Sequence, residues 1–170
     1  MFSFFKKQEN SQIQEILTDN NLYSPIQGDF LSLEKVNDPV FSEKAMGDGF
    51  AIQPTEDQLI VSPVAGEVTM VAGTKHAIGI HMANGLDILL HLGLDTVNMG
   101  GSPFNINIKV GDTVSAGQHL GIMNLEEISG AGYETTVMVI VTNMDVLETL
   151  TTNDGSYQAG EKVGTVTVKQ

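Results

Sequence analysis

The chain has 170 residues, 41% of them hydrophobic, which is enough for one domain with a substantial core. It contains no cysteine, which excludes disulfides, thiolate zinc sites and thiol nucleophiles and fits a reducing cytoplasm. The formal net charge of −13 argues against nucleic acid and anionic lipid as partners and favours a basic protein.

Residues 1–21 are predicted to form a flexible tail in front of a domain at 22–170. Four of the first five residues are apolar and two lysines follow, a block too short for a signal peptide or a membrane-spanning helix. A weak contact of this tail with a membrane surface is the alternative to a loose chain end. The start at Met1 followed by this tail favours a free-standing protein over a domain of a fused permease.

From Leu22 onward, Gly, Pro, Asn and Asp recur about every eight to twelve residues between short runs rich in Val, Ile, Thr and Leu. This spacing predicts an all-β fold, an antiparallel sandwich or barrel. Short helical turns are expected only at 145–150 and 125–129.

Two weak repeats suggest that the β fold consists of two similar halves. The segment Ser24-Pro25-Ile26-Gln27-Gly28-Asp29 is echoed by Ser62-Pro63-Val64-Ala65-Gly66-Glu67. Residues 109–114 are similarly echoed by residues 158–163, each a turn with Gly and an acid that leads into a strand. The alternative is that turn residues recur in any β protein.

The dipeptide Asn84-Gly85 lies between the strand-like runs 74–82 and 86–93 and predicts a hairpin. Asn-Gly is the preferred centre of a two-residue type I′ turn, which would place Ala83 opposite Leu86. In that register His91 is opposite Ile78, and His76 is opposite Gly93.

His76 and His91 would then be diagonal neighbours on one face, with Cα atoms about 7–8 Å apart. Thr74 would share that face because side chains alternate along a strand. A neutral imidazole can attack phosphorus while a second imidazole stabilises the phosphoryl oxygens. A zinc site and a structural histidine pair remain the alternatives. His81 is expected on the opposite face, and His119 in an exposed or ordinary packed role.

The segment GLDILLHLGLDTV, residues 85–97, resembles the signature around the phosphorylated histidine of the glucose-type enzyme IIA domains of the bacterial phosphoenolpyruvate-dependent sugar phosphotransferase system. Residues 38–54 resemble the family segment that leads into a Gly-Asp-Gly turn, and Thr74-Lys75-His76-Ala77 resembles the second active-site histidine with its preceding Thr. Residues 110–114 and 142–145 follow in family order.

This resemblance implies that His91 accepts a phosphoryl group from phospho-HPr, as tele-phosphohistidine, and passes it to the IIB cysteine of a IIBC sugar permease. His76 would stabilise the phosphoryl group, and Thr74 would orient His76. The family fold is an all-β sandwich with two related halves. The implied protein is cytoplasmic and needs no cofactor, and its activity as a phosphotransferase component depends on partner proteins.

The resemblance also implies a partner-binding surface with apolar residues at its centre and acids at its rim. The apolar positions are Val40, Phe41, Met46, Ile78 and Leu89, and the acidic ones are Asp38 and Asp95. This chain departs from the family at two nearby positions: Ala72 stands where the family has an aromatic residue, and Lys75 replaces a commoner polar neutral residue.

Three other functions compete with phosphoryl transfer. Zinc peptidases of the lysostaphin type need a His-x-His motif that neither histidine segment supplies, although two histidines could still bind zinc. Lipoyl or biotinyl carriers need a lysine at a hairpin tip, where this chain has Asn84-Gly85. A purely regulatory homologue would be expected to lose His91, although a phosphocarrier can have regulatory targets as well.

Overall fold

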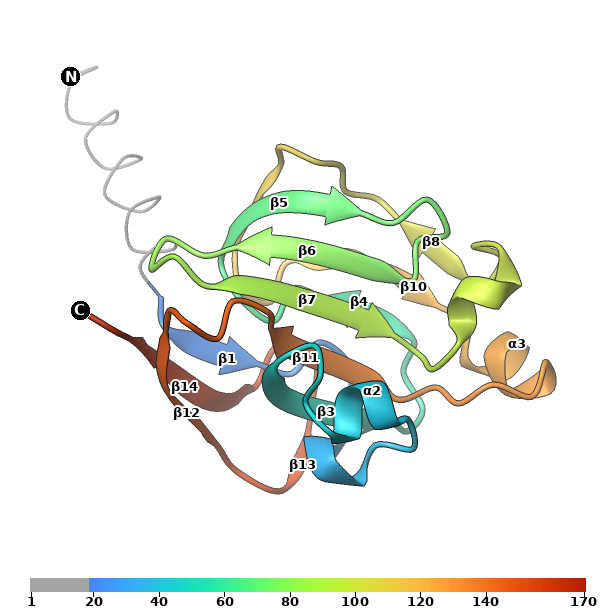
Figure 1. Ribbon diagram of the computed structural model, residues 1–170. Helices are drawn as coiled ribbons and strands as arrows, with labels where there is room; N and C mark the ends of the chain where they lie inside the picture. The colour runs from blue at the N-terminus through green and yellow to red at the C-terminus, as the bar shows by residue number, and fades with distance from the viewer. Residues whose placement is uncertain (1–18) are drawn as a thin grey trace, which may run out of the picture.

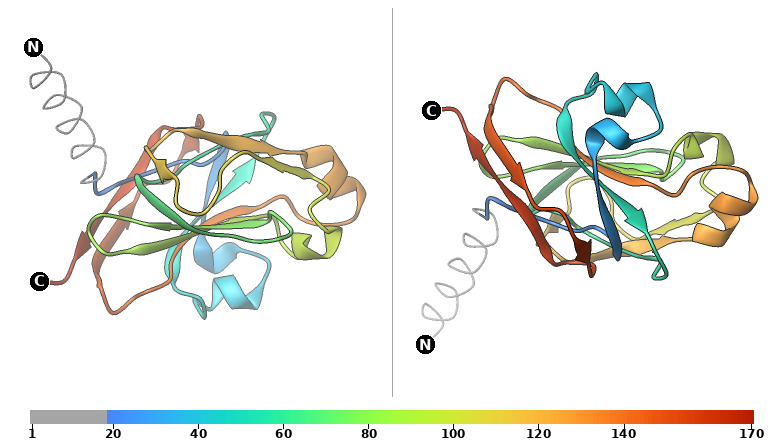
Figure 2. Two further views of the ribbon diagram at one scale, coloured as in Figure 1. Left: turned by 90° about the horizontal axis from the view of Figure 1, so that it is seen from above. Right: turned by 90° about the horizontal axis from the view of Figure 1, so that it is seen from below.

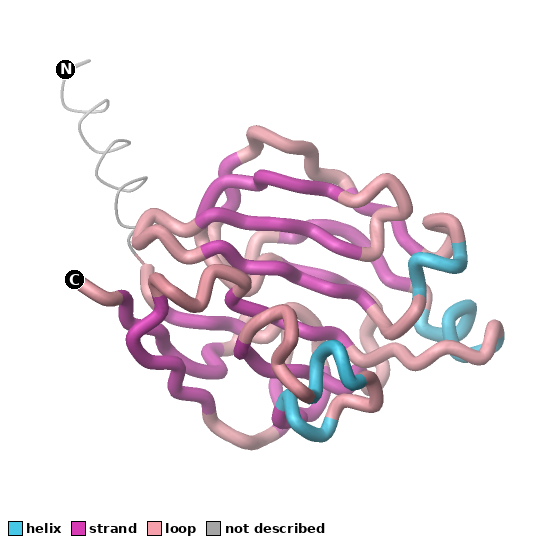
Figure 3. The backbone as a smooth tube through the Cα atoms, in the orientation of Figure 1, coloured by secondary structure: helices cyan, strands magenta, loops and turns pink. Residues whose placement is uncertain are grey.

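The computed structural model describes residues 19–170, most of them in short antiparallel strands (Figures 1 and 3). The first half of the chain contains β1 (Asn21–Tyr23), β2 (Gly28–Ser32), the 3-10 turn η1 (Leu33–Lys35), α2 (Pro39–Ser42), β3 (Asp48–Pro54), β4 (Leu59–Val61), β5 (Gly66–Val71), β6 (Ala77–His81) and β7 (Asp87–Leu92). The second half contains η2 (Thr96–Met99), β8 (Phe104–Ile106), β9 (Thr113–Val114), β10 (His119–Met123), α3 (Leu125–Gly130), β11 (Val137–Val141), β12 (Leu147–Thr152), β13 (Ser156–Tyr157) and β14 (Lys162–Val168).

The strands of residues 19–170 form three sheets, which confirms the all-β prediction. The largest has eight strands in the order β13-β2-β3-β11-β7-β6-β5-β9, and two three-stranded sheets have the orders β1-β14-β12 and β4-β10-β8. The β4-β10-β8 sheet lies behind β5, β6 and β7, whereas β12 and β14 lie at the opposite end of the molecule from α3 (Figures 1 and 2). Helix α2 stands out from the other face of the large sheet.

The strand order itself shows the predicted duplication. Read outward from its centre, the large sheet pairs β11 with β7, β3 with β6, β2 with β5 and β13 with β9, and the two small sheets match strand for strand. The repeated Ser-Pro segments exchange reciprocal bonds, since the Tyr23 amide donates to the Pro63 carbonyl (2.9 Å) and the Val61 amide to that of Pro25 (2.8 Å). The two halves therefore meet about a local twofold axis.

Equivalent turns have equivalent hydrogen bonds in the two halves. Ser24 Oγ donates to the carbonyl of Ile26 and Ser62 Oγ to that of Val64, at 2.7 and 2.6 Å. The second repeat needs a correction, because the segment that matches 158–161 is 115–118: the Gly160 amide bonds the Ser24 carbonyl, and the Gly117 amide bonds the Ser62 carbonyl. Similar Gly-acid turn sequences at 109–112 and 158–161 led to the wrong pairing.

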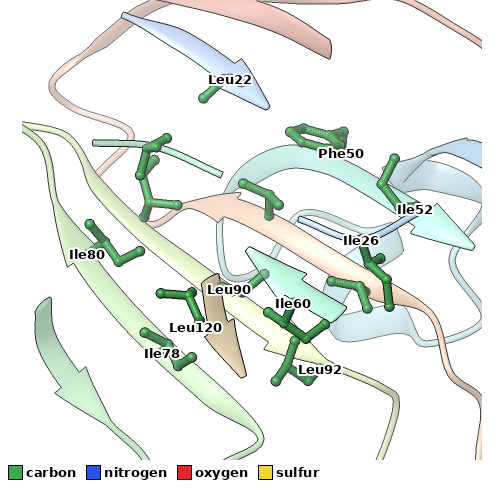
Figure 4. Packing of buried hydrophobic residues seen from close by; sticks show 14 of the residues in the cluster. Leu22, Ile26, Phe50, Ile52, Ile60, Ile78, Ile80, Leu90, Leu92 and Leu120 are labelled. Carbon is green, nitrogen blue, oxygen red and sulfur yellow. The ribbon is translucent and has the colours of Figure 1, made fainter. Parts of the chain in front are cut away.

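The core has two parts, one on each face of the large sheet. The larger cluster lies between the sheets and includes Phe50, Ile78, Leu90 and Leu120 (Figure 4). The smaller lies beneath α2 and consists of Leu33, Val36, Phe41, Ala51, Ala77, Leu89, Leu94, Met138 and Ile140. Because the central strand β11 is covered on both faces, all five of its residues are buried.

Two boundary predictions differ from the structure. The segment expected to make a helical turn at 145–150 contributes to β12, because its run of leucine and threonine residues suits a strand and pairs with β14. Strand β1 begins at Asn21, the last residue of the expected tail, whose first 18 residues lie outside the described part of the chain. The helical turn expected at 125–129 is α3, which Asn124 caps by accepting the Glu127 amide. Within residues 19–170, no helix is long and apolar enough to span a bilayer.

Candidate active site

The candidate site lies on β7, one of the two central strands of the large sheet. His91 is opposite Ala77 of β6 on one side and Met138 of β11 on the other. Its neighbours Leu90 and Leu92 point into the larger core (Figure 4), so the alternation of the strand turns His91 toward the face that carries α2. The imidazole is partly buried there, above the smaller cluster.

The hairpin register predicted from Asn84-Gly85 is wrong by one residue. The loop has three residues, Ala83 to Gly85: the Gly85 amide donates to the Met82 carbonyl, and the Met82 amide donates to that of Leu86. Among these three loop residues only Gly85 has a positive φ, 96°. A three-residue hairpin loop made of a type I turn followed by a left-handed residue has this pattern. Met82 is therefore opposite Leu86, and His91 is opposite Ala77 instead of Ile78.

His76 reaches His91 because it lies just before β6, where the backbone departs from strand geometry. Lys75 has a φ of 60°, in the left-handed region, and the alternation of the strand does not extend past Ala77. The rings of His76 and His91 have centroids 5.2 Å apart and an interplanar angle of 77°. The predicted histidine pair is confirmed, although the diagonal strand positions that led to it are not.

Thr74 contacts the second histidine as predicted. Its Oγ1 lies 2.5 Å from His76 Nδ1, which fixes the orientation of that ring. When the Thr74 hydroxyl donates to Nδ1, the proton of neutral His76 is on Nε2, where it is available to an anionic group beside His91.

A backbone contact selects the tautomer of His91. Its Nδ1 lies 2.9 Å from the carbonyl oxygen of Gly93, an acceptor only, so the ring donates from Nδ1 and Nε2 keeps a lone pair. Burial lowers the pKa of His91, and the neighbouring His76 lowers it further. The bond to Gly93 and the carboxylates Asp38 and Asp95 act in the opposite direction. Burial also lowers the pKa of His76, so both imidazoles are neutral near pH 7.

Helix α2 packs its one buried residue, Phe41, against the site. The phenyl ring meets the His91 imidazole edge-on, with centroids 5.0 Å apart and an interplanar angle of 60°. Asp38 caps the helix by accepting the Val40 amide at 3.0 Å, and Pro39 begins the first turn. This short helix therefore brings both an aromatic ring and a carboxylate to His91.

The expected partner-binding residues divide by exposure. Val40 and Met46 are 46% and 37% exposed, and Asp95 is exposed at a left-handed position before η2. Phe41 and Leu89 are 4% and 8% exposed and mainly support the surface from below. Ile78 is a correction: it is fully buried in the larger core, because the true register turns it away from His91.

The structure adds surface features that the sequence analysis missed. A groove of about 500 Å³ is lined by Met46, Thr69, Met70, Gly79, Asp87, Ile88, Leu89 and Thr142. It lies beside Leu89 because Gly79, opposite Leu89 in β6, has no side chain to fill the space. Val97, 48% exposed on η2, is another apolar residue near the rim. The one-residue register error concealed the groove, since it paired Leu89 with Ile80.

The remaining histidines lie outside the pair. His81 is exposed and its Nδ1 lies 2.6 Å from a carboxylate oxygen of Asp87, and His119 is exposed in β10. In residues 19–170, no three His, Cys, Asp or Glu side chains are grouped so that they could hold a metal ion. A zinc ion at His76 and His91 would therefore need its other ligands from elsewhere.

A family model described as phosphoenolpyruvate-dependent sugar phosphotransferase system, EIIA 1, matches residues 20–147, which include both histidines. The chain belongs to this EIIA family. The family places it among the phosphotransferase components of sugar transport, and the all-β architecture with a histidine pair agrees with that assignment.

Curated relatives of this EIIA chain are named as glucose-specific components of the PTS system. The glucose-specific EIIA component of Staphylococcus aureus (strain COL) is 44% identical over 132 residues, which cover 78% of this chain and 79% of the relative. The corresponding component of Halalkalibacterium halodurans is 38% identical over 169 residues and covers 99% and 96%. The glucose-specific EIICBA component of Streptococcus pneumoniae is 43% identical over 143 residues, which are 84% of this chain but only 19% of that protein.

A solved structure shares the fold of this EIIA chain. The glucose permease IIA from Mycoplasma capricolum superposes with a TM-score of 0.77 at 32% sequence identity and covers 85% of this chain and 93% of that one.

Proposed function

We propose that the chain carries a phosphoryl group on His91 Nε2, which it receives from phospho-HPr and passes to the IIB cysteine of a sugar permease. The observation that carries this proposal is the bond from His91 Nδ1 to the Gly93 carbonyl, because it leaves Nε2 as the nucleophilic nitrogen. The lowered pKa of His91 supports it, since the neutral imidazole is the reactive form.

In the proposed reaction, the lone pair of Nε2 attacks phosphorus while the bond from phosphorus to the donor's histidine nitrogen breaks. The electron pair of that bond returns to the donor nitrogen, and the His91 ring gains positive charge. The Gly93 carbonyl, Asp38 and Asp95 are the groups that favour a charged His91, so they would also stabilise the ring during transfer. Onward transfer reverses these steps, with a thiolate as the attacking group.

His76 is proposed to stabilise the phosphoryl oxygens during onward transfer to the IIB cysteine. Its ring stands edge-on to His91 and is fixed by Thr74, so its Nε2 proton would be directed to one side of the phosphoryl group. It would not carry the phosphoryl group itself.

The partners follow from the surface around the pair and from the relatives. Exposed Val40 and Met46 offer an apolar centre, and Asp38 and Asp95 at the rim suit basic residues on HPr. The fused EIICBA relative supports IIB and IIC permease components as partners, and the glucose-specific names of the relatives suggest a glucose-type permease. HPr and IIB would meet this chain in the cytoplasm.

The test is incubation with phosphoenolpyruvate, enzyme I and HPr, followed by mass spectrometry under mild conditions. We expect the gain of one acid-labile phosphate, which His91→Ala abolishes and which His119→Ala, a change of an exposed histidine outside the site, leaves unchanged. If His91→Ala still gains the phosphate, His91 is not the acceptor.

The two histidine roles separate in a second experiment. We expect His76→Gln to accept phosphate from HPr but to transfer it to a IIB domain about 100-fold or more slowly, because the flexible Gln amide replaces the imidazole N–H that Thr74 holds in place. Transfer at the normal rate would contradict the supporting role of His76.

A further inference from the structure

The Gly93 carbonyl, which selects the tautomer of His91, belongs to a turn with a left-handed residue at its centre. Gly93 has a φ of 82°, so the chain leaves β7 sharply at this point. Its amide donates to the Thr136 carbonyl at 2.9 Å, and the next amide, of Leu94, donates to the Glu134 carbonyl at 3.0 Å. These bonds tie one side of the turn to the segment before β11.

The other side of the turn is held by one side chain, Thr96. It is fully buried, and its Oγ1 donates to the carbonyl of Leu92 at 2.5 Å. Its methyl group occupies the space that a side chain at position 93 would need, since a Cβ there would lie 2.4 Å from Cγ2 of Thr96. Thr96 thus bonds the peptide before Gly93 and packs against Gly93 itself.

The position of this carbonyl has a chemical consequence. A neutral imidazole has one N–H, and a histidine side chain free in water prefers to have it on Nε2. A hydrogen bond of 2.9 Å to a fixed acceptor reverses this preference at His91. If the Gly93 carbonyl moved away, the proton would shift to Nε2 and remove the lone pair on that nitrogen.

We propose that Thr96 is a positioning residue for His91: its hydroxyl bond to Leu92 holds the 92–94 turn, so that the Gly93 carbonyl keeps the proton on Nδ1. Its effect on transfer rests on the proposed function of His91, whereas its effect on the tautomer does not. The contact that selects the tautomer of His91 is with the Gly93 carbonyl, and Thr96 acts through its bond to the neighbouring Leu92 carbonyl.

The test compares Thr96→Val, which keeps the shape and removes the hydroxyl, with Thr96→Ser, which keeps the hydroxyl. Nitrogen-15 NMR of the His91 ring reports the tautomer directly. We expect Thr96→Val to give a mixed population of Nδ1–H and Nε2–H forms and phosphorylation by phospho-HPr about tenfold or more slower. Thr96→Ser should keep the Nδ1–H form and react within about threefold of the wild-type rate.

Ser62→Ala is the matched control, because Ser62 is also fully buried and its hydroxyl also donates to a backbone carbonyl, at 2.6 Å, but outside the site. It should lose stability without changing the His91 tautomer. A pure Nδ1–H form in Thr96→Val, with destabilisation like that of Ser62→Ala, would show that Thr96 is only structural. If Thr96→Val does not fold, Thr96→Cys, which has a weaker donor, should show the mixed population, and a pure Nδ1–H form there would also overturn the proposal.

The NMR measurement separates this inference from the proposed function. If the wild-type chain accepts no phosphoryl group, the tautomer of His91 still reports whether Thr96 positions the Gly93 carbonyl. If phosphorylation occurs but the tautomer is insensitive to Thr96, only the inference about Thr96 fails.

Discussion

Removal of the Phe41 ring should change the titration of His91 as well as the stability of the domain. Phe41 is 4% exposed, packs in the smaller cluster and meets the His91 ring edge-on at 5.0 Å. Burial is the largest cause of the lowered pKa of His91. Phe41→Ala would let water reach the imidazole, and the pKa should therefore rise toward its ordinary value of about 6.5.

The stability effect follows from the size of the buried ring. A Phe→Ala change in a core costs about 3–5 kcal/mol, whereas a domain of this kind is stable by about 5–15 kcal/mol. With a urea m-value of about 2 kcal/mol/M, the midpoint should fall by about 2 M and leave the variant folded in buffer. NMR titration of His91 then measures the pKa, and the pH profile of phosphorylation should shift to higher pH.

Phe104→Ala provides the control, because Phe104 is similarly buried, 8% exposed, but belongs to the larger cluster. It should lose comparable stability and leave the pKa of His91 unchanged. If Phe41→Ala destabilises the domain but the pKa of His91 stays as low as in the wild type, burial by Phe41 does not cause the shift.

Three further predictions follow from described contacts. Gly66→Ala should cost at least about 2 kcal/mol in the free energy of unfolding, because its Cβ would lie 2.3 Å from the His81 carbonyl, whereas Gly73→Ala, with open space, should stay within about 0.5 kcal/mol. His76→Gln should raise the pKa of His91 by NMR, since the His76 charge lowers it; an unchanged value would contradict that coupling. Because the pKa values of His76 and His91 are both lowered, the unfolded chain binds more protons, so the free energy of unfolding should fall as the pH drops below about 6.5. Urea unfolding at pH 7.5 and 5.5 should show a smaller fall in the double variant His76→Gln/His91→Gln, and an equal fall would refute the assignment.

The histidine pair could be predicted from the sequence, but its geometry could not. The Asn-Gly signal identified the hairpin correctly, whereas the choice between a two-residue and a three-residue loop depends on the φ of Asn84, which packing decides. The error of one residue exchanged the two faces of β6 and placed Ile78 at the site. His76 nevertheless met His91, because the chain bends at Lys75, a conformation that no local pattern indicated.

The duplication was detectable because Ser-Pro turns with a buried serine hydroxyl leave a recognisable sequence pattern. The contacts that tune His91 leave no such pattern: the acceptor is a backbone carbonyl, and Phe41 reaches the ring from a helix of only four residues. Side-chain identity alone does not specify such contacts, since they depend on the backbone path at Gly93 and on where α2 packs.

The three-residue loop at the tip of the β6–β7 hairpin has a consequence for how this surface can evolve. His91 is also held in register by β11, opposite Met138, so β7 cannot rotate to compensate for a change in its partner. With a loop shorter or longer by one residue, the register of β7 with β6 would no longer fit its register with β11. The change would also turn an isoleucine of β6 toward the histidine face in place of a small residue. Substitutions in the loop are therefore tolerable where insertions and deletions of single residues are not, and the length of a segment far from the histidines determines which residue of β6 lies beside His91.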